Sequence, residues 1–325
     1  MHEKLHIIII IIIISITTTN TTTTTNTNTN TTNTTISTMD QDQQISSKSR
    51  KITINMLLNA TSLTKSSSES NESYLKRVTH LHLQGKRIKT IDNIDKCTNL
   101  KVLYLYDNQI EIIENLDFAS NLQYLQLQCN DIKELPELTM SSLTKIYLDE
   151  NEIAYTTGLE NCGKLEELHI SKQRLPSFTS LQFDPLSLNA ISKTLQVLEI
   201  SGNGISLLNP FAVLHNLRKL FAANNQVVDL AEIESIICLS KLAEAIFIGN
   251  PCSNILQYRD YVIGASSDAL RVLDDLPVQK HQQVAIRGLM KHRRKLGLAP
   301  SNVVIPKTTN KQERFEFTVM PPAPM

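Results

Sequence analysis

The side chains that could do chemistry in this sequence are histidines, tyrosines and carboxylates that recur about every 22 residues. His80, His82 and His169 are the ones that could hold a metal ion or transfer a proton. His80 and His82 alternate along one segment, so they share a face if that segment is a strand. His169 lies four repeats further along, and at about 4.8 Å per strand the three imidazoles cannot reach one ion. These histidines therefore predict no metal site.

Sequence motifs of enzymes are missing as well. The chain contains no phosphate-binding G-x-x-x-x-G-K-[ST] or G-x-G-x-x-G loop, no H-E-x-x-H and no G-x-S-x-G. Its five cysteines are odd in number and never form C-x-x-C, which excludes a disulfide framework and a zinc site and predicts buried free thiols in a reducing compartment. We expect a non-enzymatic protein with no cofactor and no small-molecule substrate.

An internal repeat supplies the elements that position the polar side chains. The pattern L-x-x-L-x-L-x-x-N-x-I starts at residues 78, 100, 122, 143, 165, 195, 217, 242 and 270. A period near 22 falls within the range of leucine-rich repeats, about 20–29 residues. The leucines point inward from a short strand, and the asparagine turns the chain and binds backbone groups left unpaired there. The predicted fold is an α/β solenoid, a leucine-rich-repeat horseshoe with a parallel concave β-sheet and short helical or irregular convex segments.

Composition divides the chain further. The predicted segments are a low-complexity head (1–50), an N-terminal flank (51–77), the repeat array (78–276) with its C-terminal cap (251–276), a basic helix (277–297) and a disordered tail (298–325). The head joins a run of isoleucines to a Thr/Asn tract, and we interpret it as translated simple-repeat sequence upstream of a start at Met39 or Met56. A secretory signal is the alternative, and the apolar run is too short for a membrane span of about 20 residues.

The step of 30 residues between the copies that start at 165 and 195 contains an insertion of eight residues, beginning in Gln173–Pro185. Insertions in repeat arrays map to loops on one face and are often functional. A longer turn without a function of its own is the alternative.

The residues between the inward leucines project from the predicted concave sheet. They include four of the eight tyrosines of the chain, and tyrosine is enriched at interface hot spots. We therefore predict a protein-binding surface, although strands also favour aromatic residues for their own stability. The predicted partner-binding residues are His82, Tyr104, Tyr106, Tyr124, Tyr147, Asp149, Glu167, His169, Glu199 and Phe221.

A formal net charge of zero conceals a separation of charge along the chain. Residues 78–275 contain 25 acidic and 16 basic side chains, a net charge of −9, whereas residues 276–325 contain 2 and 9, a net charge of +7. We expect an amphipathic helix whose apolar face holds Val284, Ile286, Leu289 and Leu296. Its basic face fits an acidic microtubule surface, a nucleic acid, a membrane or plain solvation. The candidate attachment residues are Lys280, Arg287, Lys291, Arg293, Arg294 and Lys295.

Four stretches carry a family resemblance: YLYDNQI (Tyr104–Ile110), ELHISKQRLP (Glu167–Pro176), LQFDPLSL (Leu181–Leu188) and LEISGNGI (Leu198–Ile205). Over about residues 50–295 the chain resembles the testis-type leucine-rich-repeat family of protein phosphatase 1 regulatory subunit 42. The resemblance implies docking of the protein phosphatase 1 catalytic subunit, association with tubulin or microtubule-associated proteins, and a cytoplasmic location at the cytoskeleton, at centrosomes or another microtubule-organising centre. The head has no counterpart in that family.

Three hypotheses follow. The first is a non-enzymatic adaptor, a regulatory or targeting subunit of protein phosphatase 1 at microtubules or centrosomes, with no nucleic acid and no membrane partner. The second is a structural ciliary or centrosomal scaffold that binds tubulin or motor subunits without the phosphatase. The third is a secreted or cell-surface recognition module. The nearest match to a basic-[VI]-x-[FW] phosphatase-docking motif, Arg314–Phe317, has Phe at the [VI] position, so we expect docking on the concave face.

Overall fold

The structure is a computed structural model that describes residues 50–295. The predicted disordered tail, and the predicted head apart from Arg50, lie outside this range. None of the helices within it has both the length and the apolar character needed to cross a membrane.

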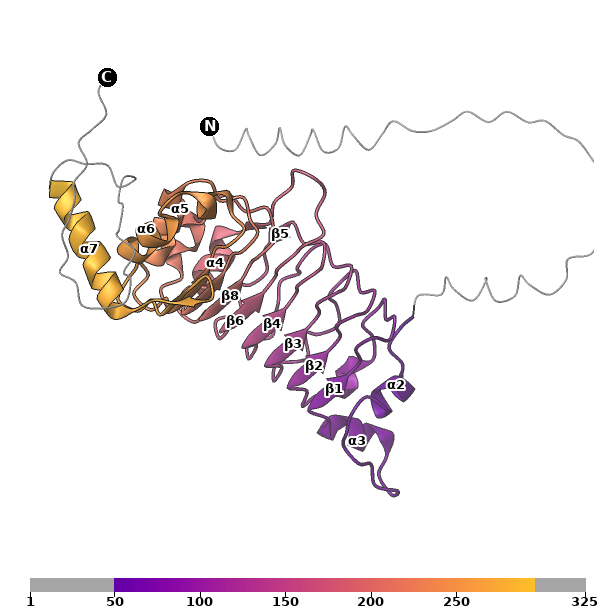
Figure 1. The fold of residues 1–325 in the computed structure, drawn as a ribbon. Coiled ribbons are helices and arrows are strands. Elements are labelled where there is room, and N and C mark those ends of the chain that lie inside the picture. The colour runs from indigo at the N-terminus through magenta and orange to yellow at the C-terminus, as the bar shows by residue number, and fades with distance from the viewer. Residues whose placement is uncertain (1–49, 296–325) are drawn as a thin grey trace, which may run out of the picture. The chain divides into compact units, whose positions relative to one another are not determined.

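Nine parallel strands and one antiparallel strand form a single sheet in the order β1-β2-β3-β4-β6-β8-β9-β10-β11-β12 (Figure 1). The strands are β1 (His80–His82), β2 (Val102–Tyr104), β3 (Tyr124–Gln126), β4 (Lys145–Tyr147), β6 (Glu167–His169), β8 (Val197–Glu199), β9 (Lys219–Phe221), β10 (Glu244–Ile246), β11 (Val272–Leu273) and β12 (Leu276–Pro277). The middle residue of each three-residue strand is buried. Equivalent positions of successive repeats pair directly, as Leu103 does with Leu125. The predicted solenoid with a parallel sheet is confirmed.

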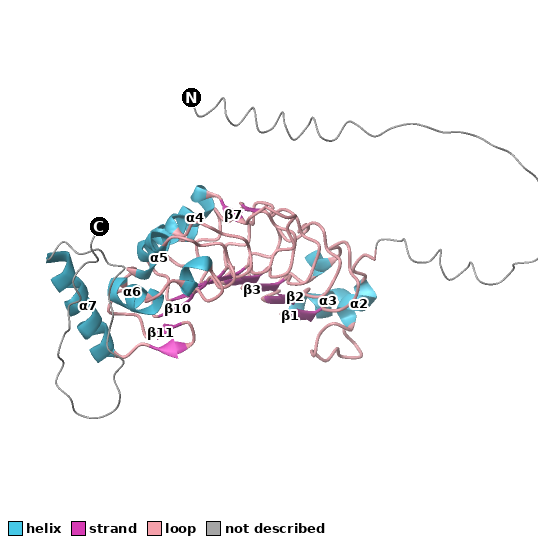
Figure 2. Cartoon of the chain, turned by 45° about the horizontal axis from the view of Figure 1, so that its top comes forward, coloured by secondary structure: helices cyan, strands magenta, loops and turns pink. Residues whose placement is uncertain are grey.

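The returning segments lie on the side of the core opposite the sheet (Figure 2). They are η1 (Ile94–Lys96), β5 (Tyr155–Thr156), β7 (Gln182–Phe183), α4 (Pro185–Ile191), η2 (Asn209–Val213), α5 (Leu230–Ile237) and η3 (Pro251–Asn254). Ile113 and Leu116 show how an irregular return still packs, since both are buried against the core.

The insertion forms ordered structure that adds to the core, unlike a simple surface loop. Its strand β7 pairs in parallel with β5, and its helix α4 begins at Pro185 after Asp184, whose side chain accepts a hydrogen bond from Ser187 N. Leu188 and Ile191 on this helix are buried. The eight added residues therefore build one more layer of the convex side.

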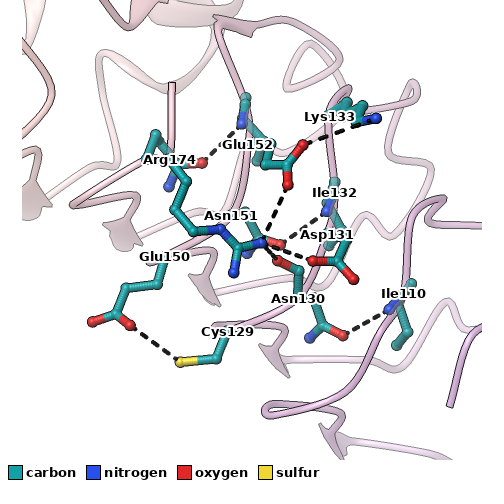
Figure 3. Close-up of polar contacts among 12 residues, drawn as sticks. Ile110, Cys129, Asn130, Asp131, Ile132, Lys133, Glu150, Asn151, Glu152 and Arg174 are labelled. Carbon is teal, nitrogen blue, oxygen red and sulfur yellow. Dashed lines mark hydrogen bonds and ion pairs between the residues drawn. The ribbon is translucent and has the colours of Figure 1, made fainter. Parts of the chain in front are cut away.

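Asparagine side chains hold successive repeats together at the end of each strand. Asn130 is buried, its Nδ2 donates to Leu105 O at 3.0 Å and to Leu127 O at 2.9 Å, and its Oδ1 accepts from Ile110 N at 3.0 Å (Figure 3). The same bonding pattern recurs at Asn151. We call this row of buried amides the asparagine ladder; its members are Asn108, Asn130, Asn151, Gln173, Asn203, Asn225 and Asn250. The predicted bonding of the turn asparagine to unpaired backbone is confirmed.

The residue before each ladder amide has a left-handed backbone conformation. Cys129 and Glu150 have φ of 56° and 57°, and Gly202 has φ of 71°. Asparagine, aspartate and glycine adopt this conformation most readily, so cysteine and glutamate at this place carry a local cost that the ladder bonds offset.

Arg174 ties the start of the insertion to two earlier repeats. Its Nη2 donates to the carbonyl oxygen of Asn130 and to Asp131 Oδ1 at 2.9 Å, and it lies 3.5 Å from Glu152 Oε1 (Figure 3). One guanidinium therefore links three consecutive turns on the side of the sheet where the strands end.

The N-terminal end of the core is covered by α2 (Ile54–Leu58) and α3 (Asn71–Arg77). Leu57 and Tyr74 are buried there. His82 N donates to Ala60 O at 2.7 Å, which satisfies part of the open edge of β1.

At the other end, α6 (Tyr258–Ala265) and the β11–β12 hairpin close the array. Arg259 Nη1 donates to Leu273 O at 2.8 Å and Nη2 donates to Pro277 O at 3.1 Å, so one side chain fixes both strands of the hairpin. Asp274 Oδ1 accepts from Phe247 N at 2.7 Å, which bonds the hairpin to the last full repeat.

The basic helix α7 (Lys280–Lys295) packs against α6 (Figure 1), and of its predicted apolar face Ile286 is buried and Leu289 is half-buried. Gln283 and Ile286 are buried, whereas Val284, which we expected on the apolar face, is 63% exposed. Met290 packs so closely on Gly264 that a Cβ there would lie 2.2 Å from its sulfur. The expectation for Val284 was wrong because α6 receives the 283–286–290 side of the helix; Leu296 lies outside the described residues.

Asn130→Ala tests the asparagine ladder. The change leaves the buried amide of Ile110 without its acceptor and removes one of the two amide donors of Leu105 O and of Leu127 O, so we expect the free energy of unfolding to fall by about 1–3 kcal/mol. Urea unfolding followed by circular dichroism measures this. The control is Asn161→Ala, at an exposed asparagine bonded only to Glu137, for which we expect a change within about 0.5 kcal/mol. Equal losses in both variants would contradict the assigned role of the ladder.

Candidate protein-binding surface

The alternation of side chains along each strand creates the surface on the open side of the sheet, which we call the concave face. On β3, Leu125 is buried while Tyr124 and Gln126 are half-buried on the other side. Because the register pairs equivalent positions, the outward residues of successive repeats become neighbours about 4.8 Å apart.

Five aromatic rings on five neighbouring strands form a continuous row on the concave face. Successive ring centroids lie 4.8, 6.5, 5.3 and 4.4 Å apart, with the first and last pairs stacked. We call this row the aromatic ladder; its members are His82, Tyr104, Tyr124, Tyr147 and His169. Aromatic pairs in this range stabilise one another by about 0.5–1.5 kcal/mol each, so the rings hold each other in place before a partner arrives.

A chain of polar contacts fixes the C-terminal half of the aromatic ladder. Tyr124 donates to the hydroxyl of Tyr147 at 2.9 Å, and Tyr147 donates to Glu167 Oε2 at 3.1 Å. Lys145 Nζ lies 2.7 Å from Glu167 Oε1 and 5.7 Å from the centre of the Tyr124 ring. Burial and the hydrogen bond from Tyr124 hold the pKa of Tyr147 well above its usual range, so this phenol stays neutral.

The acids and the histidine at the end of the ladder are partly desolvated. Burial lowers the pKa of His169, and its Nε2 lies 4.0 Å from Glu167 Oε2. Burial raises the pKa of Glu199, whose carboxylate accepts from Ser201 N at 2.8 Å. Asp149 accepts from the backbone and the hydroxyl of Ser171, both at 2.7 Å.

Five buried side-chain polar atoms have no hydrogen-bond partner within residues 50–295, and three of them belong to the concave face: Gln84 Oε1, Gln128 Oε1 and His169 Nε2. All three side chains occupy outward positions of the repeat, on the same side as the aromatic ladder. Buried acceptors without a partner are costly, and donors of a bound protein would satisfy them.

The structure brings together only part of the predicted set. The structure joins six of them in a row of pairwise contacts, and Asp149 and Glu199 lie on the same face; the six are His82, Tyr104, Tyr124, Tyr147, Glu167 and His169. Tyr106 and Phe221 are half-buried, and among the described residues neither ring stacks on another. Sequence reasoning missed Lys145, although it pairs in register with Glu167, which places opposite charges side by side.

The predicted tail residues do not act as one group. Arg287 donates to Ser266 O at 2.6 Å and binds the carboxylate of Asp268, so it anchors α7 to the loop before β11. Lys280, Lys291 and Lys295 are exposed. The side chains of Arg293 and Arg294 lie outside the described set.

The cysteines match the expectation of buried thiols only in part. Cys97, Cys162 and Cys252 are free and buried, and burial raises the pKa of the Cys97 thiol to about 11. Cys238 is exposed and Cys129 is intermediate, so for these two the expectation was wrong. Across residues 50–295, His, Cys, Asp and Glu side chains form no group of three that could hold a metal ion.

His169→Gln tests the desolvation at the end of the aromatic ladder. The unfolded chain binds a proton at this imidazole more readily than the folded chain does, because burial lowers the folded pKa from 6.5. Stability contributed by the neutral imidazole is therefore lost as the pH falls below about 6.5. The urea concentration at the midpoint of unfolding should fall less in the variant than in the parent when the pH is lowered from about 8 to about 5. The exposed-site control His215→Gln should keep the parental slope, and a parental slope in His169→Gln would contradict the assignment.

Comparison with known proteins agrees with this geometry. A family model for leucine-rich repeats (two copies) matches residues 76–117. The chain is 28% identical over 148 residues to the probable U2 small nuclear ribonucleoprotein A′ of Caenorhabditis elegans, a match that covers 40% of this chain and 58% of the relative. The chain thus matches somewhat more than half of that relative's length.

Solved structures show the same fold. Internalin C2 of Listeria monocytogenes is similar with a TM-score of 0.50 and 23% identity, over 62% of this chain and 88% of the internalin. Another internalin of that bacterium has a TM-score of 0.49 and 23% identity, over 64% of each chain. The repeat of about 22 residues, the parallel sheet that it builds and the family-model match over residues 76–117 identify the chain as a leucine-rich-repeat protein.

Proposed function

We propose that the protein is a non-enzymatic adaptor that binds the catalytic subunit of protein phosphatase 1 on its concave face. The observation that carries the protein-binding role is the aromatic ladder, five rings already assembled on neighbouring strands. The choice of the phosphatase rests on the resemblance of the four sequence stretches described above.

The concave face is suited to binding a partner protein because its contact side chains are ordered before binding. Tyr124, Tyr147 and Glu167 hold one another through hydrogen bonds, so little side-chain entropy is lost when a partner docks. The rings offer large apolar area and the phenol oxygens remain polar, the combination found at interface hot spots. Tyrosine and histidine dominate β1 to β3, which carry no Asp, Glu, Lys or Arg.

A second candidate function is favoured by the similarity to U2 small nuclear ribonucleoprotein A′. In that case the chain is a protein-binding subunit of a ribonucleoprotein particle. A third candidate, a cytoskeletal scaffold in the cytoplasm at centrosomes, rests on the exposed Lys280, Lys291 and Lys295 of α7, which fit an acidic microtubule surface.

Affinity purification of the tagged full-length chain from its own cells separates these candidates. We expect the phosphatase catalytic subunit among the co-purifying proteins. Recovery of ribonucleoprotein subunits with small nuclear RNA and no phosphatase favours the second candidate. Recovery of tubulin alone favours the third.

Tyr104→Ala/Tyr147→Ala tests the concave face directly. Loss of two rings from the aromatic ladder removes hot-spot contacts, so we expect the dissociation constant for the purified phosphatase catalytic subunit to rise about tenfold or more, measured by isothermal titration calorimetry. The matched control is Tyr155→Ala/Phe178→Ala, two exposed aromatic residues away from the concave face. Equal affinity of both variants contradicts a concave-face site, and absence of binding by the parent contradicts the phosphatase assignment.

A further inference from the structure

The repeat array has two rims, and their charges are paired to different extents. The N-terminal ends of the strands lie along one rim, which we call the leading edge, and the C-terminal ends lie along the other, which we call the trailing edge. Around Arg174 the acids of the trailing edge, Asp131, Glu150 and Glu152, each form an ion pair with a nearby base. Figure 3 shows the pairs of Arg174 with Asp131 and Glu152. The leading edge of the C-terminal repeats carries cations instead.

Backbone hydrogen bonds place two of these cations on the same rim, with one turn between them. Arg218 N donates to Gln196 O at 2.8 Å, Ala243 N donates to Arg218 O at 2.8 Å, and Arg271 N donates to Ala243 O at 2.7 Å. Arg218 and Arg271 are therefore two turns apart, about 10 Å at the spacing of strands.

A second row runs beside the first. The side-chain amide of Asn216 donates to the carbonyl oxygen of Lys193, and the ammonium of Lys241 donates to the side-chain oxygen of Asn216. We call the four cations of the two rows the basic leading edge; its members are Lys193, Arg218, Lys241 and Arg271.

The four cations of the basic leading edge form no direct ion pairs among the described residues. All four side chains are exposed, and within residues 50–295 none forms an ion pair with a carboxylate. The concave face differs, because there Lys145 and Lys219 each lie 2.7 Å from a glutamate. Four neighbouring cations repel one another at low ionic strength, and an anionic ligand would relieve that repulsion.

A shallow hollow of about 280 Å³ opens within this edge. It is lined by Glu166, Lys193, Thr194, Gln196, Asn216 and Arg218. The Gln196 amide and the Thr194 hydroxyl can bond the backbone of an extended peptide while the cations bind its carboxylates.

Helix α7 extends the positive charge beyond the last repeat. The one acid in the loop before β11, Asp268, is bound by Arg287. This hydrogen bond, with Arg271 and Lys280 nearby, holds the pKa of Asp268 below its usual range. The Asp268 carboxylate is thus bonded to Arg287 and interacts with Arg271 and Lys280 only through space.

We propose that the basic leading edge binds an acidic, extended polypeptide segment of a partner protein. The lining of the hollow contains no aromatic side chain on which a base could stack, and Glu166 would oppose a continuous row of phosphates. The net charge of −9 on residues 78–275 also opposes a long polyanion more than a short acidic peptide. The surface lies on the rim, apart from the aromatic ladder, so it is independent of the proposed phosphatase site.

Fluorescence anisotropy with the full-length protein tests the proposal. The probe is a labelled peptide of alternating glutamate and glycine, and a glutamine–glycine peptide of equal length is the neutral control. We expect the glutamate peptide to bind, with affinity that falls as salt rises, and the glutamine peptide not to bind. Absence of binding by the glutamate peptide overturns the proposal.

The test variant is Lys193→Glu/Arg218→Glu/Lys241→Glu, for which we expect the dissociation constant to rise about tenfold or more. The matched control is Lys86→Glu/Lys89→Glu/Lys101→Glu, which changes the net charge equally at the other end of the array; Lys101 occupies the repeat position of Arg218. Thermal melting confirms that both variants fold. Equal weakening by the two variants would mean that only net charge matters.

Two further measurements separate this surface from other sites. Tyr104→Ala/Tyr147→Ala should bind the glutamate peptide as the parent does, and loss of binding there would move the peptide to the concave face. An oligouridine that binds more tightly than the peptide and displaces it would assign the edge to RNA and overturn the proposal.

Discussion

The buried amide at the end of each strand is the interaction on which the rest of the structure depends. A turn that reverses the chain after three strand residues leaves backbone groups without partners, and a buried unpaired group costs about 1–3 kcal/mol. Asn130 meets this need in its own turn through Leu127 O and in the preceding turn through Leu105 O and Ile110 N. Because each amide bonds two turns, repeats cannot slip relative to one another without breaking a row of buried hydrogen bonds.

A fixed register converts a period in the sequence into proximity in space. Tyr124 and Tyr147 are 23 residues apart, yet their hydroxyls meet at 2.9 Å because their strands are neighbours. The same rule sets Arg218 beside Gln196 and Ala243 on the leading edge. A solenoid therefore builds surfaces from single positions of the repeat, and the composition of one position decides what that surface can bind.

Features that recur with the repeat could be predicted from the sequence. Contacts that depend on packing outside the repeat could not. The strands, the buried middle residues and the ladder amides follow from the pattern, and so does the common face of Tyr104 and Tyr147. The stacking of rings depends on rotamers, which alternation along a strand does not determine. Arg287 looked like a free tail cation, but a carboxylate in the loop before β11 binds it. Helix α4 follows directly on the pairing of β5 with β7, whose paired residues are 27 positions apart in the sequence and belong to no repeat position.

Pairing on the concave face explains why the neighbouring leading edge keeps free charge. Lys219 and Glu244 lie opposite each other on β9 and β10 and pair at 2.7 Å. Glu244 is thereby already paired, and Arg218, one residue before Lys219, forms no ion pair among the described residues. The two lysines of the concave face are thus paired with glutamates, while the cations on the rim beside it remain unpaired. This difference in pairing exists within the array, and no sum of charges over a segment of the chain reveals it.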